Sequence, residues 1–216
     1  MPIFALEPEL IFPPVHLAEP DGLLAIGGDL SPERLQLAYR SGIFPWFEGK
    51  EILWWSPDPR FILIPEELKV SKSMNVLLKR QAFRFTINQA FEQVIENCKS
   101  VKRDGQLGTW ITPDMKQAYI KLHQLGVAQS AEAWEGEELV GGLYGIRMGK
   151  AFFGESMFSK KSNASKYAFI RLVQQLQLEG VALIDCQVYT EHLESLGARM
   201  IPRTSFIDRI RLLTGN

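Results

Sequence analysis

Two polar residues, Asp185 and Gln187, interrupt the apolar segment Val-Ala-Leu-Ile-Asp-Cys-Gln-Val at 181–188. An apolar run of this length predicts a central β-strand. Residues two apart in a strand share a face, with Cα atoms roughly 7 Å apart, so Asp185 and Gln187 face one side and Cys186 the other. Buried hydrogen-bonding side chains need partners. The pair therefore either ties the strand to a neighbouring loop or belongs to a ligand site.

A third polar residue, Glu155, lies in the segment Gly-Glu-Ser-Met-Phe at 154–158, which we expect to pair near the first strand. Its neighbours in the sequence are apolar: Phe152, Phe153, Met157 and Phe158. A carboxylate among such side chains is costly without a counter-charge. Three polar groups that converge on an apolar floor are typical of a ligand site. Glu155 thus favours the ligand-site interpretation of Asp185 and Gln187.

The elements that position these residues follow from the apolar pattern. An antiparallel hairpin is predicted from Leu139 to Ser159, joined through Met148 and Gly149, and a helix over 164–179 leads from it to the strand at 181–188. The pattern also predicts strands at 83–87 and 128–134, and helices at 73–80, 88–98, 113–125, 191–196 and 205–213. This order predicts an α+β fold with a mixed sheet.

The beginning of the chain differs in composition, because most of its 12 prolines fall at or before Pro65. Proline at this density builds turns and irregular segments. We therefore expect a small, loop-rich N-terminal domain over 1–60 and a larger domain over 61–216. One helix is clearly marked in the first domain, with Ser31 as its N-cap, a proline at its first position and Gly42 after its end.

The composition excludes several classes of protein. A net charge of -1 argues against a protein that coats nucleic acid, although it allows a local basic patch. The sequence has 2 cysteines, which indicates reduced thiols rather than a disulfide framework, and its 3 histidines stand too far apart to suggest a metal site. No secretion signal and no membrane span are expected, so we expect a cytoplasmic protein.

Basic residues concentrate in two places. Between Lys69 and Phe91 there is no acidic residue, and the basic ones are Lys69, Lys72, Lys79, Arg80 and Arg84. Around the start of the helix at 164–179, for which Ser162 or Asn163 is the expected cap, the basic residues are Lys160, Lys161 and Lys166. Each group is either a solvated helix face or a surface for phosphate, and a helix N-terminus with added lysines suits an anion.

Three tryptophans, Trp46, Trp54 and Trp55, lie in proline-containing segments of the N-terminal domain. They are either core residues of a small domain or a platform on which a nucleic-acid base stacks.

Several motifs occur in the order found in a known family. They are Asp-Gly-Leu-Leu-Ala-Ile-Gly-Gly-Asp-Leu-Ser (21–31), Gly-Ile-Phe-Pro-Trp-Phe (42–47), Trp-Trp-Ser-Pro-Asp-Pro-Arg (54–60), Gly-Thr-Trp-Ile-Thr (108–112), Gly-Glu-Ser-Met-Phe-Ser (154–159), Asn-Ala-Ser-Lys (163–166) and Ile-Asp-Cys-Gln (184–187). Together, from about Asp21 to Leu213, they resemble the leucyl/phenylalanyl-tRNA-protein transferases of bacteria.

This resemblance implies transfer of leucine or phenylalanine from tRNA to a protein that begins with arginine or lysine, which marks that protein for degradation by the N-end rule. It implies a larger domain similar to the acetyltransferase (GNAT) fold, no cofactor, and aminoacyl-tRNA and acceptor proteins as partners. An apolar pocket is also expected to accept methionine and to exclude β-branched residues by shape. We expect a monomer that does not bind membranes.

The resemblance also suggests roles for individual residues. Asp185 and Gln187 are the expected catalytic pair: the Gln187 amide oxygen accepts a hydrogen bond from the attacking amine, and Asp185 either orients that amide or takes up the proton by relay. Glu155 is the expected counter-charge for the acceptor's amine or basic side chain. Trp46 and Trp110 are expected near the terminal adenosine of tRNA, although Trp110 fits a core position as well. The aminoacyl pocket is expected at Phe152, Met157 and Ile184, with Leu143 and Leu172 as further walls.

Two other functions fit parts of the pattern. A CoA-dependent N-acetyltransferase of similar fold would hold pyrophosphate with a glycine-containing loop, but the corresponding stretch, 158–166, has no glycine. A non-catalytic RNA- or peptide-binding module would bind without turnover.

Overall fold

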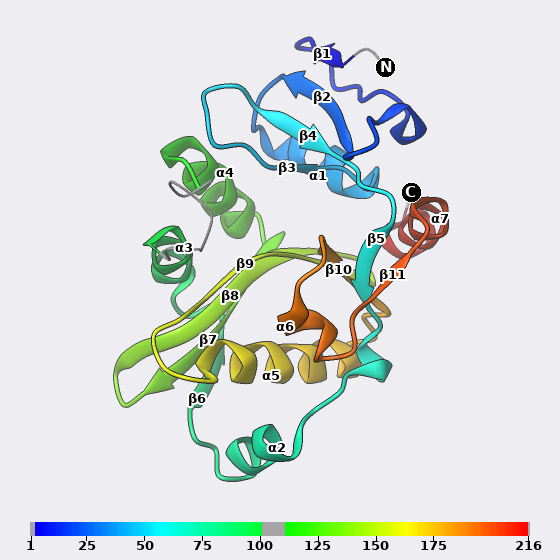
Figure 1. Cartoon of the computed structure of the whole chain (residues 1–216). Coiled ribbons are helices and arrows are strands. Elements are labelled where there is room, and N and C mark those ends of the chain that lie inside the picture. Colours follow the sequence, from blue (N-terminus) through cyan, green and yellow to red (C-terminus); the bar gives the residue numbers. More distant parts are fainter. Residues whose placement is uncertain (1–2, 101–110, 216) are drawn as a thin grey trace.

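The computed structural model describes residues 3–100 and 111–215 of the 216-residue chain (Figure 1). Within these residues the strands form a four-stranded sheet of order β1-β2-β4-β3 and a seven-stranded sheet of order β11-β5-β10-β9-β8-β7-β6. The small sheet contains β1 (Phe4–Leu6), β2 (Leu23–Gly27), β3 (Phe44–Pro45) and β4 (Leu53–Trp55). The large sheet contains β5 (Arg60–Leu63), β6 (Arg84–Ile87), β7 (Ala128–Glu135), β8 (Glu138–Met148), β9 (Ala151–Ser159), β10 (Leu183–Gln187) and β11 (Arg199–Ile201).

The helices agree closely with the predicted positions. They are α1 (Pro32–Arg40), α2 (Lys72–Lys79), α3 (Phe91–Ser100), α4 (Pro113–Gln124), α5 (Ala164–Leu178), α6 (Glu191–Glu194) and α7 (Arg203–Thr214), with short 3-10 turns at Val15–Leu17 and Pro65–Glu67. The predicted cap is confirmed for α1, where Ser31 Oγ accepts the Arg34 N–H at 3.3 Å. The cap of α4 is of the same kind, because Thr112 Oγ1 accepts the Met115 N–H at 3.2 Å.

The predicted cap of α5 is confirmed in its position. Asn163 occupies the cap position, but in the left-handed conformation with φ +67° and without a side-chain cap bond. Ser159 Oγ, at the end of β9, instead accepts the Ser165 N–H at 3.2 Å. The strand before the helix therefore satisfies one of the free amides at its N-terminus.

The large sheet is mixed, as predicted. The hairpin of β8 and β9 is antiparallel, and α5 then crosses over so that β10 pairs parallel with β9, with Ile184 opposite Phe152 and Asp185 opposite Phe153. The order of these elements is a hairpin, a helix and a parallel strand. This is the order expected from the stated resemblance to the acetyltransferase fold. The pairing of β10 with β9 puts the segment of Asp185 beside the segment of Glu155.

Helices cover both faces of the large sheet (Figure 1). The α5 face carries a buried cluster that includes Phe152, Ile184 and Cys186. The other face, covered by α3 and α4, carries a cluster that includes Phe153 and Leu183. This alternation confirms that Cys186 faces away from the side of Leu183 and Asp185.

The first sixty residues are more regular than expected, because they contain a four-stranded sheet as well as α1. Leu35, Ala38 and Tyr39 of α1 are fully buried and belong to the same cluster as residues of α3 and α4. β5 begins at Arg60, so strand pairing assigns that residue to the large sheet. The division into domains at 60 and 61 stays a prediction, and the shared cluster means that the two parts pack on each other.

Two further properties concern the whole described chain. Within residues 3–100 and 111–215, no helix combines the length and the apolar character that a membrane span requires. The same residues contain no group of three or more histidine, cysteine or acidic side chains arranged to hold a metal ion. Cys98 and Cys186 are both buried, and neither forms a disulfide.

Candidate active site

A cavity of about 480 Å³ lies between β3, the hairpin of β8 and β9, the end of β10, and α6. Asp185, Gln187 and Glu155 all border this cavity, as do Trp46 and Met157. The rest of its lining is largely apolar and includes Phe44, Leu143, Phe169, Val188 and Leu193. The structure thus brings the three polar residues chosen from the sequence together on one apolar cavity.

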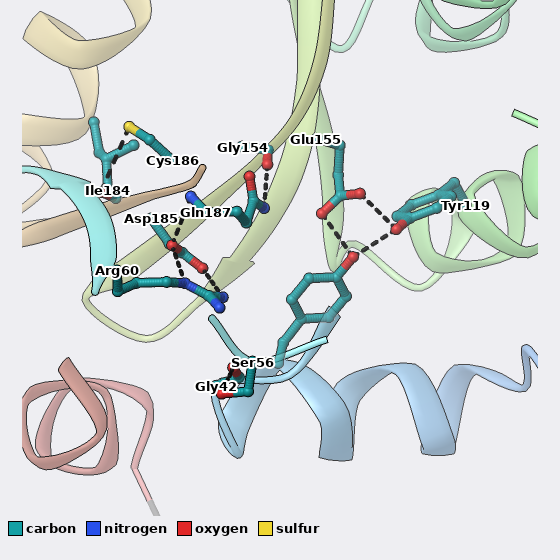
Figure 2. A network of polar contacts seen from close by, with 11 residues as sticks. Gly42, Ser56, Arg60, Tyr119, Gly154, Glu155, Ile184, Asp185, Cys186 and Gln187 are labelled. Atoms are coloured by element: carbon teal, nitrogen blue, oxygen red, sulfur yellow. Dashed lines mark hydrogen bonds and ion pairs between the residues drawn. The ribbon is translucent and has the colours of Figure 1, made fainter. Parts of the chain in front are cut away.

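Asp185 is fully buried and paired with a buried arginine, Arg60 (Figure 2). Its Oδ1 accepts from Arg60 Nε at 2.8 Å and its Oδ2 from Arg60 Nη2 at 2.7 Å, which is a bidentate ion pair. The rings of Phe44 and Phe206 lie 4.7 Å and 4.6 Å from the guanidinium carbon. The carboxylate is therefore held on the cavity wall by a cation enclosed between two aromatic rings.

Gln187 ends β10 in an irregular conformation. Its φ is +58°, and the pairing with β5 shifts between Asp185 and Gln187, so Cys186 is the extra residue of a β-bulge. The Gln187 N–H donates to Asp185 Oδ1 at 3.0 Å, and its side-chain amide donates to the carbonyl of Gly154 (Figure 2). Neither bond uses the side-chain amide oxygen of Gln187, a residue that borders the cavity.

Glu155 also lies in a β-bulge, because Tyr144 pairs with Ser156 and Gly145 with Gly154, which leaves Glu155 as the extra residue. A bulge changes the direction of a side chain. Here the carboxyl group meets two phenols: Tyr39 of α1 donates to Oε1 and Tyr119 of α4 donates to Oε2, each at 2.6 Å. The two hydroxyl oxygens lie 2.5 Å apart.

The pKa of Glu155 is raised to about 8 from its ordinary value of 4.5. Burial is the main cause, and the hydrogen bonds from Tyr119 and Tyr39 partly oppose it. Burial and the nearby carboxylate likewise raise the pKa of both phenols, so these act as hydrogen-bond donors. The partner expected for Glu155 from the sequence was a cation, and the partners inside the chain are hydroxyl groups.

The predicted aminoacyl pocket divides into two groups. Leu143 and Met157 line the cavity together with Phe169, which was not predicted. Phe152, Ile184 and Leu172 do not line it. Phe152 and Ile184 are paired on neighbouring strands and pack with Leu172 of α5 in the cluster that also contains Leu143 and Phe169. They are core residues that pack behind the cavity wall.

The tryptophans have different environments. Trp46 is 39% exposed and borders the cavity, and its ring centroid lies 5.8 Å from that of Trp55. Trp54 is a core residue, fully buried, and its Nε1 donates to the carbonyl of Gly27 at 2.9 Å. The prediction for Trp110 falls outside the described residues.

The basic residues also separate into two surfaces. Those of the first group are all exposed, on or beside α2 and at the start of β6: Lys69, Lys72, Lys79, Arg80 and Arg84. Lys160, Lys161 and Lys166 surround a second cavity of about 380 Å³ at the start of α5, and His192 borders both cavities. Lys161 forms an ion pair with Glu135, which raises the pKa of its ammonium group.

Two family models match the sequence. The model described as leucyl/phenylalanyl-tRNA protein transferase covers residues 62–211, and the model of that transferase's N-terminal domain covers residues 28–58. The chain belongs to the leucyl/phenylalanyl-tRNA protein transferase family. The two matches cover the large sheet and most of the segment that supplies Tyr39 and Trp46.

Close relatives in this family cover nearly the whole chain. A leucyl/phenylalanyl-tRNA-protein transferase of Christiangramia forsetii is 60% identical over 208 residues, which are 95% of this chain and 98% of the relative. Proteins of the same name from Anaeromyxobacter sp. (strain K) and Flavobacterium johnsoniae are 58% and 56% identical, cover 97% of this chain, and are themselves covered to 91% and 99%. Among solved structures, L-PGS from Bacillus licheniformis is a distant likeness, with TM-score 0.42 and 15% identity over 87% of this chain and 65% of that one.

Three residues that contact the polar groups of the site in this family member were not predicted as site residues from the sequence. Arg60 closes the Trp-Trp-Ser-Pro-Asp-Pro-Arg motif, and an arginine at the start of an apolar strand was a signal for a buried ion pair. Tyr39 lies on the buried face of α1, but nothing in the sequence indicated its partner. Tyr119 lies on the buried face of α4, where a hydroxyl group must also find a partner.

Proposed function

We propose that this chain transfers leucine or phenylalanine, and also methionine, from aminoacyl-tRNA to the N-terminal arginine or lysine of acceptor proteins, which marks them for N-end rule degradation. Membership of the family supports aminoacyl transfer. One observation carries the assignment of the site: Asp185, Gln187 and Glu155 border a single apolar cavity whose edge includes Trp46. A cytoplasmic location, a monomeric state and independence of any cofactor belong to the same proposal.

The chemistry requires a neutral and correctly aimed amine. The aminoacyl ester is already activated, whereas an α-amine has a pKa of about 8 and is largely protonated at neutral pH. The amine first loses one proton and its nitrogen then attacks the ester carbonyl. The peptide bond forms, the ester C–O bond breaks, and the second amine proton passes to the ribose oxygen that leaves. Holding the two reactants together supplies much of the rate.

Gln187 is suited to aim the amine. Its side-chain N–H donates to the Gly154 carbonyl, which restrains the amide group of a residue that borders the cavity. An amide oxygen accepts a hydrogen bond but cannot act as a base at neutral pH. The proposed role of Gln187 is therefore to orient the amine, with Asp185 as its support.

Glu155 is suited to receive the acceptor's positive charge. Its pKa of about 8 is close to that of an α-amine, so a proton passes between the two groups with little cost. A carboxyl group that is mostly protonated when the cavity is empty becomes a carboxylate when an ammonium group lies beside it. Glu155 thereby binds the acceptor and takes up its first proton.

The apolar part of the cavity is the proposed aminoacyl pocket. Leu143, Met157 and Phe169 supply its walls, and the packed core behind them keeps its shape. A slot of this kind separates side chains by about 1–3 kcal/mol per methylene, which allows leucine, phenylalanine and methionine together. Trp46 is the proposed stacking surface for the terminal adenosine, and the two basic surfaces are proposed to contact tRNA phosphates.

A transfer assay tests the proposal. The protein is incubated with tRNA charged with radioactive phenylalanine and a peptide that begins with arginine, with acetyl-CoA offered in a parallel reaction. We expect labelled peptide from the charged tRNA, none from a peptide with a blocked N-terminus, and a large loss in the Gln187→Ala variant. Acetylation would instead support the acetyltransferase interpretation, and binding of both substrates without product would support the non-catalytic module.

A further inference from the structure

Arg60 is an unusual residue for the interior of this protein. Its side chain is only 1% exposed, and charged side chains are rarely buried without a partner. It begins β5, lies between Phe44 of β3 and Phe206 of α7, and reaches Asp185 of β10. The guanidinium group therefore contacts three other elements, although Arg60 does not line the cavity itself.

The hydrogen bonds of Asp185 show what this arginine controls. Oδ1 accepts from both Arg60 Nε and the Gln187 N–H, and Oδ2 accepts from Arg60 Nη2 (Figure 2). The carboxylate is thus fixed in plane by a fork of two donors, while one of its oxygens holds the backbone of the residue two positions later. Its position at the bulge is set by Arg60.

Gln187 needs this support because its backbone is in an unfavourable region. A φ of +58° is rare for any residue except glycine, and asparagine and aspartate are the usual exceptions. The bond from its N–H to Asp185 is one of two that hold this conformation, and the other is the side-chain bond to Gly154. A chain of contacts therefore runs from Arg60 through Asp185 to the Gln187 amide oxygen.

We infer that Arg60 is a positioning residue for the transfer reaction, and that Asp185 acts as the oriented acceptor that fixes the Gln187 turn rather than as the group that takes a proton from the amine. The inference rests on the proposed function. Asp185 could either orient Gln187 or take up a proton from the amine. The inference favours orientation, because both carboxylate oxygens already accept hydrogen bonds from Arg60. In a purely structural role, Arg60 would only hold β3, β5 and α7 together and would have no effect on Gln187.

A double-mutant cycle separates these possibilities. Arg60→Gln and Asp185→Asn each leave an unpaired buried charge, whereas the double variant is neutral and its two amides can hydrogen-bond to each other. The amide oxygen that replaces the carboxylate at position 185 can also still accept the Gln187 N–H. We expect each single variant to lower kcat by on the order of 100-fold with little change in KM for aminoacyl-tRNA. The double variant should recover about tenfold or more of that loss.

Two results would overturn the inference. A double variant that folds with wild-type thermal stability but is as inactive as Asp185→Asn would show that the Asp185 charge takes part in the chemistry. A fully active Arg60→Gln variant would show that Arg60 does not position Gln187 for the transfer reaction. Arg34→Gln is the matched control, since Arg34 is equally buried but bonds to Asp29 and the backbone of residues 7–9; we expect it to lower stability and leave kcat unchanged.

Hydrogen exchange at the Gln187 amide provides a readout that does not depend on activity. This amide should be protected in the wild-type chain, exchange at least about tenfold faster in Arg60→Gln, and regain protection in the double variant. Unchanged protection in Arg60→Gln would refute the positioning role even if transfer is lost. Failure of the wild-type chain to transfer phenylalanine would refute the proposed function and leave the exchange result to decide on Arg60.

Discussion

At the scale of single residues, the site depends on how one carboxyl group is held. In the described part of the chain Glu155 lies beside two phenols, which support its charge by hydrogen bonds rather than by an ion pair. Burial raises the pKa of Glu155 against the effect of these bonds, so the carboxyl group is largely protonated at neutral pH and can ionise when a cationic acceptor arrives. Two predictions concern this residue.

The first prediction concerns substrate binding. Glu155→Gln keeps the size of the side chain but removes its charge, and with it a charge-assisted hydrogen bond worth about 1.5–3 kcal/mol. We expect KM for an arginine-starting peptide to rise roughly tenfold or more, with a much smaller change for Phe-tRNA. Steady-state kinetics with each substrate varied in turn measure both values. Equal losses for the two substrates would argue for a structural role.

The second prediction concerns stability and pH. Because the folded-state pKa of Glu155 is raised to about 8 above its ordinary value of 4.5, its stabilising contribution is fully present below pH 4.5 and is lost as pH rises through about 8. Glu155→Gln does not titrate. We therefore expect the Tm of this variant, relative to wild type, to increase steadily from pH 5 to pH 8 or 9 in thermal melts.

Glu92→Gln, at an exposed position on α3, is the control for this second prediction and should show no such trend. A Tm difference between Glu155→Gln and wild type that does not change with pH would contradict a raised pKa.

Much of the site at this scale could be predicted from the sequence. The i, i+2 spacing of Asp185 and Gln187 and the apolar surroundings of Glu155 identified three residues that do share a cavity. The partners could not be predicted, because Tyr39 and Arg60 are distant in sequence, by 116 residues from Glu155 and by 125 from Asp185. The bulges at Glu155 and Cys186 also escaped prediction, since they depend on strand pairing.

At the scale of elements, α1 is the part that joins the N-terminal residues to the site. Its buried face carries Tyr39, whose hydroxyl reaches Glu155 in β9, and it also contacts α4 and α7. Its boundaries were predictable because the cap, the proline and the final glycine are local signals. The short strands β1 to β4 could not be predicted, because runs of two to five residues among prolines are too short to show an alternation of apolar and polar residues.

The third prediction tests this junction. Tyr39→Phe removes one hydrogen bond that lowers the pKa of Glu155, so we expect that pKa to rise further and the transfer rate at pH 7 to fall roughly tenfold. The pH dependence of kcat/KM should shift upward as well. Tyr167→Phe, in the cluster on the α5 face of the sheet, is the control and should change neither rate nor pH dependence. A Tyr39→Phe variant with the wild-type profile would contradict the coupling.

At the scale of the whole molecule, a net charge of -1 conceals an uneven distribution. Basic residues cluster near α2 and at the start of α5, on parts of the surface where tRNA phosphates are proposed to bind. The two groups of basic residues could be predicted, because the basic residues of each group lie close together in the sequence. The hydrophobic core that the two parts of the chain share could not be predicted, because it depends on contacts between residues far apart in the sequence.

The fourth prediction concerns the salt dependence of tRNA binding. Replacing Lys72, Lys79 and Arg80 with alanine should weaken binding and reduce the slope of log affinity against log salt by about 0.7–0.9 for each phosphate that these side chains neutralise. Binding titrations at several salt concentrations measure this slope. Lys121→Ala, at an exposed position on α4 across the sheet, should leave the slope unchanged. An unaltered slope in the triple variant would exclude the α2 surface from the interface with tRNA.

The burial of both native thiols makes the molecule convenient for site-specific labelling. Cys98 is fully buried, and Cys186, which borders the main cavity, is only 7% exposed. Burial also raises the pKa of the Cys186 thiol, so the reactive thiolate is scarce. A maleimide dye should therefore leave the natural chain unmodified while reacting readily with Val188→Cys, because Val188 borders the main cavity and is 49% exposed. Fluorescence from a dye attached there would report when the cavity fills, without removal of either natural cysteine.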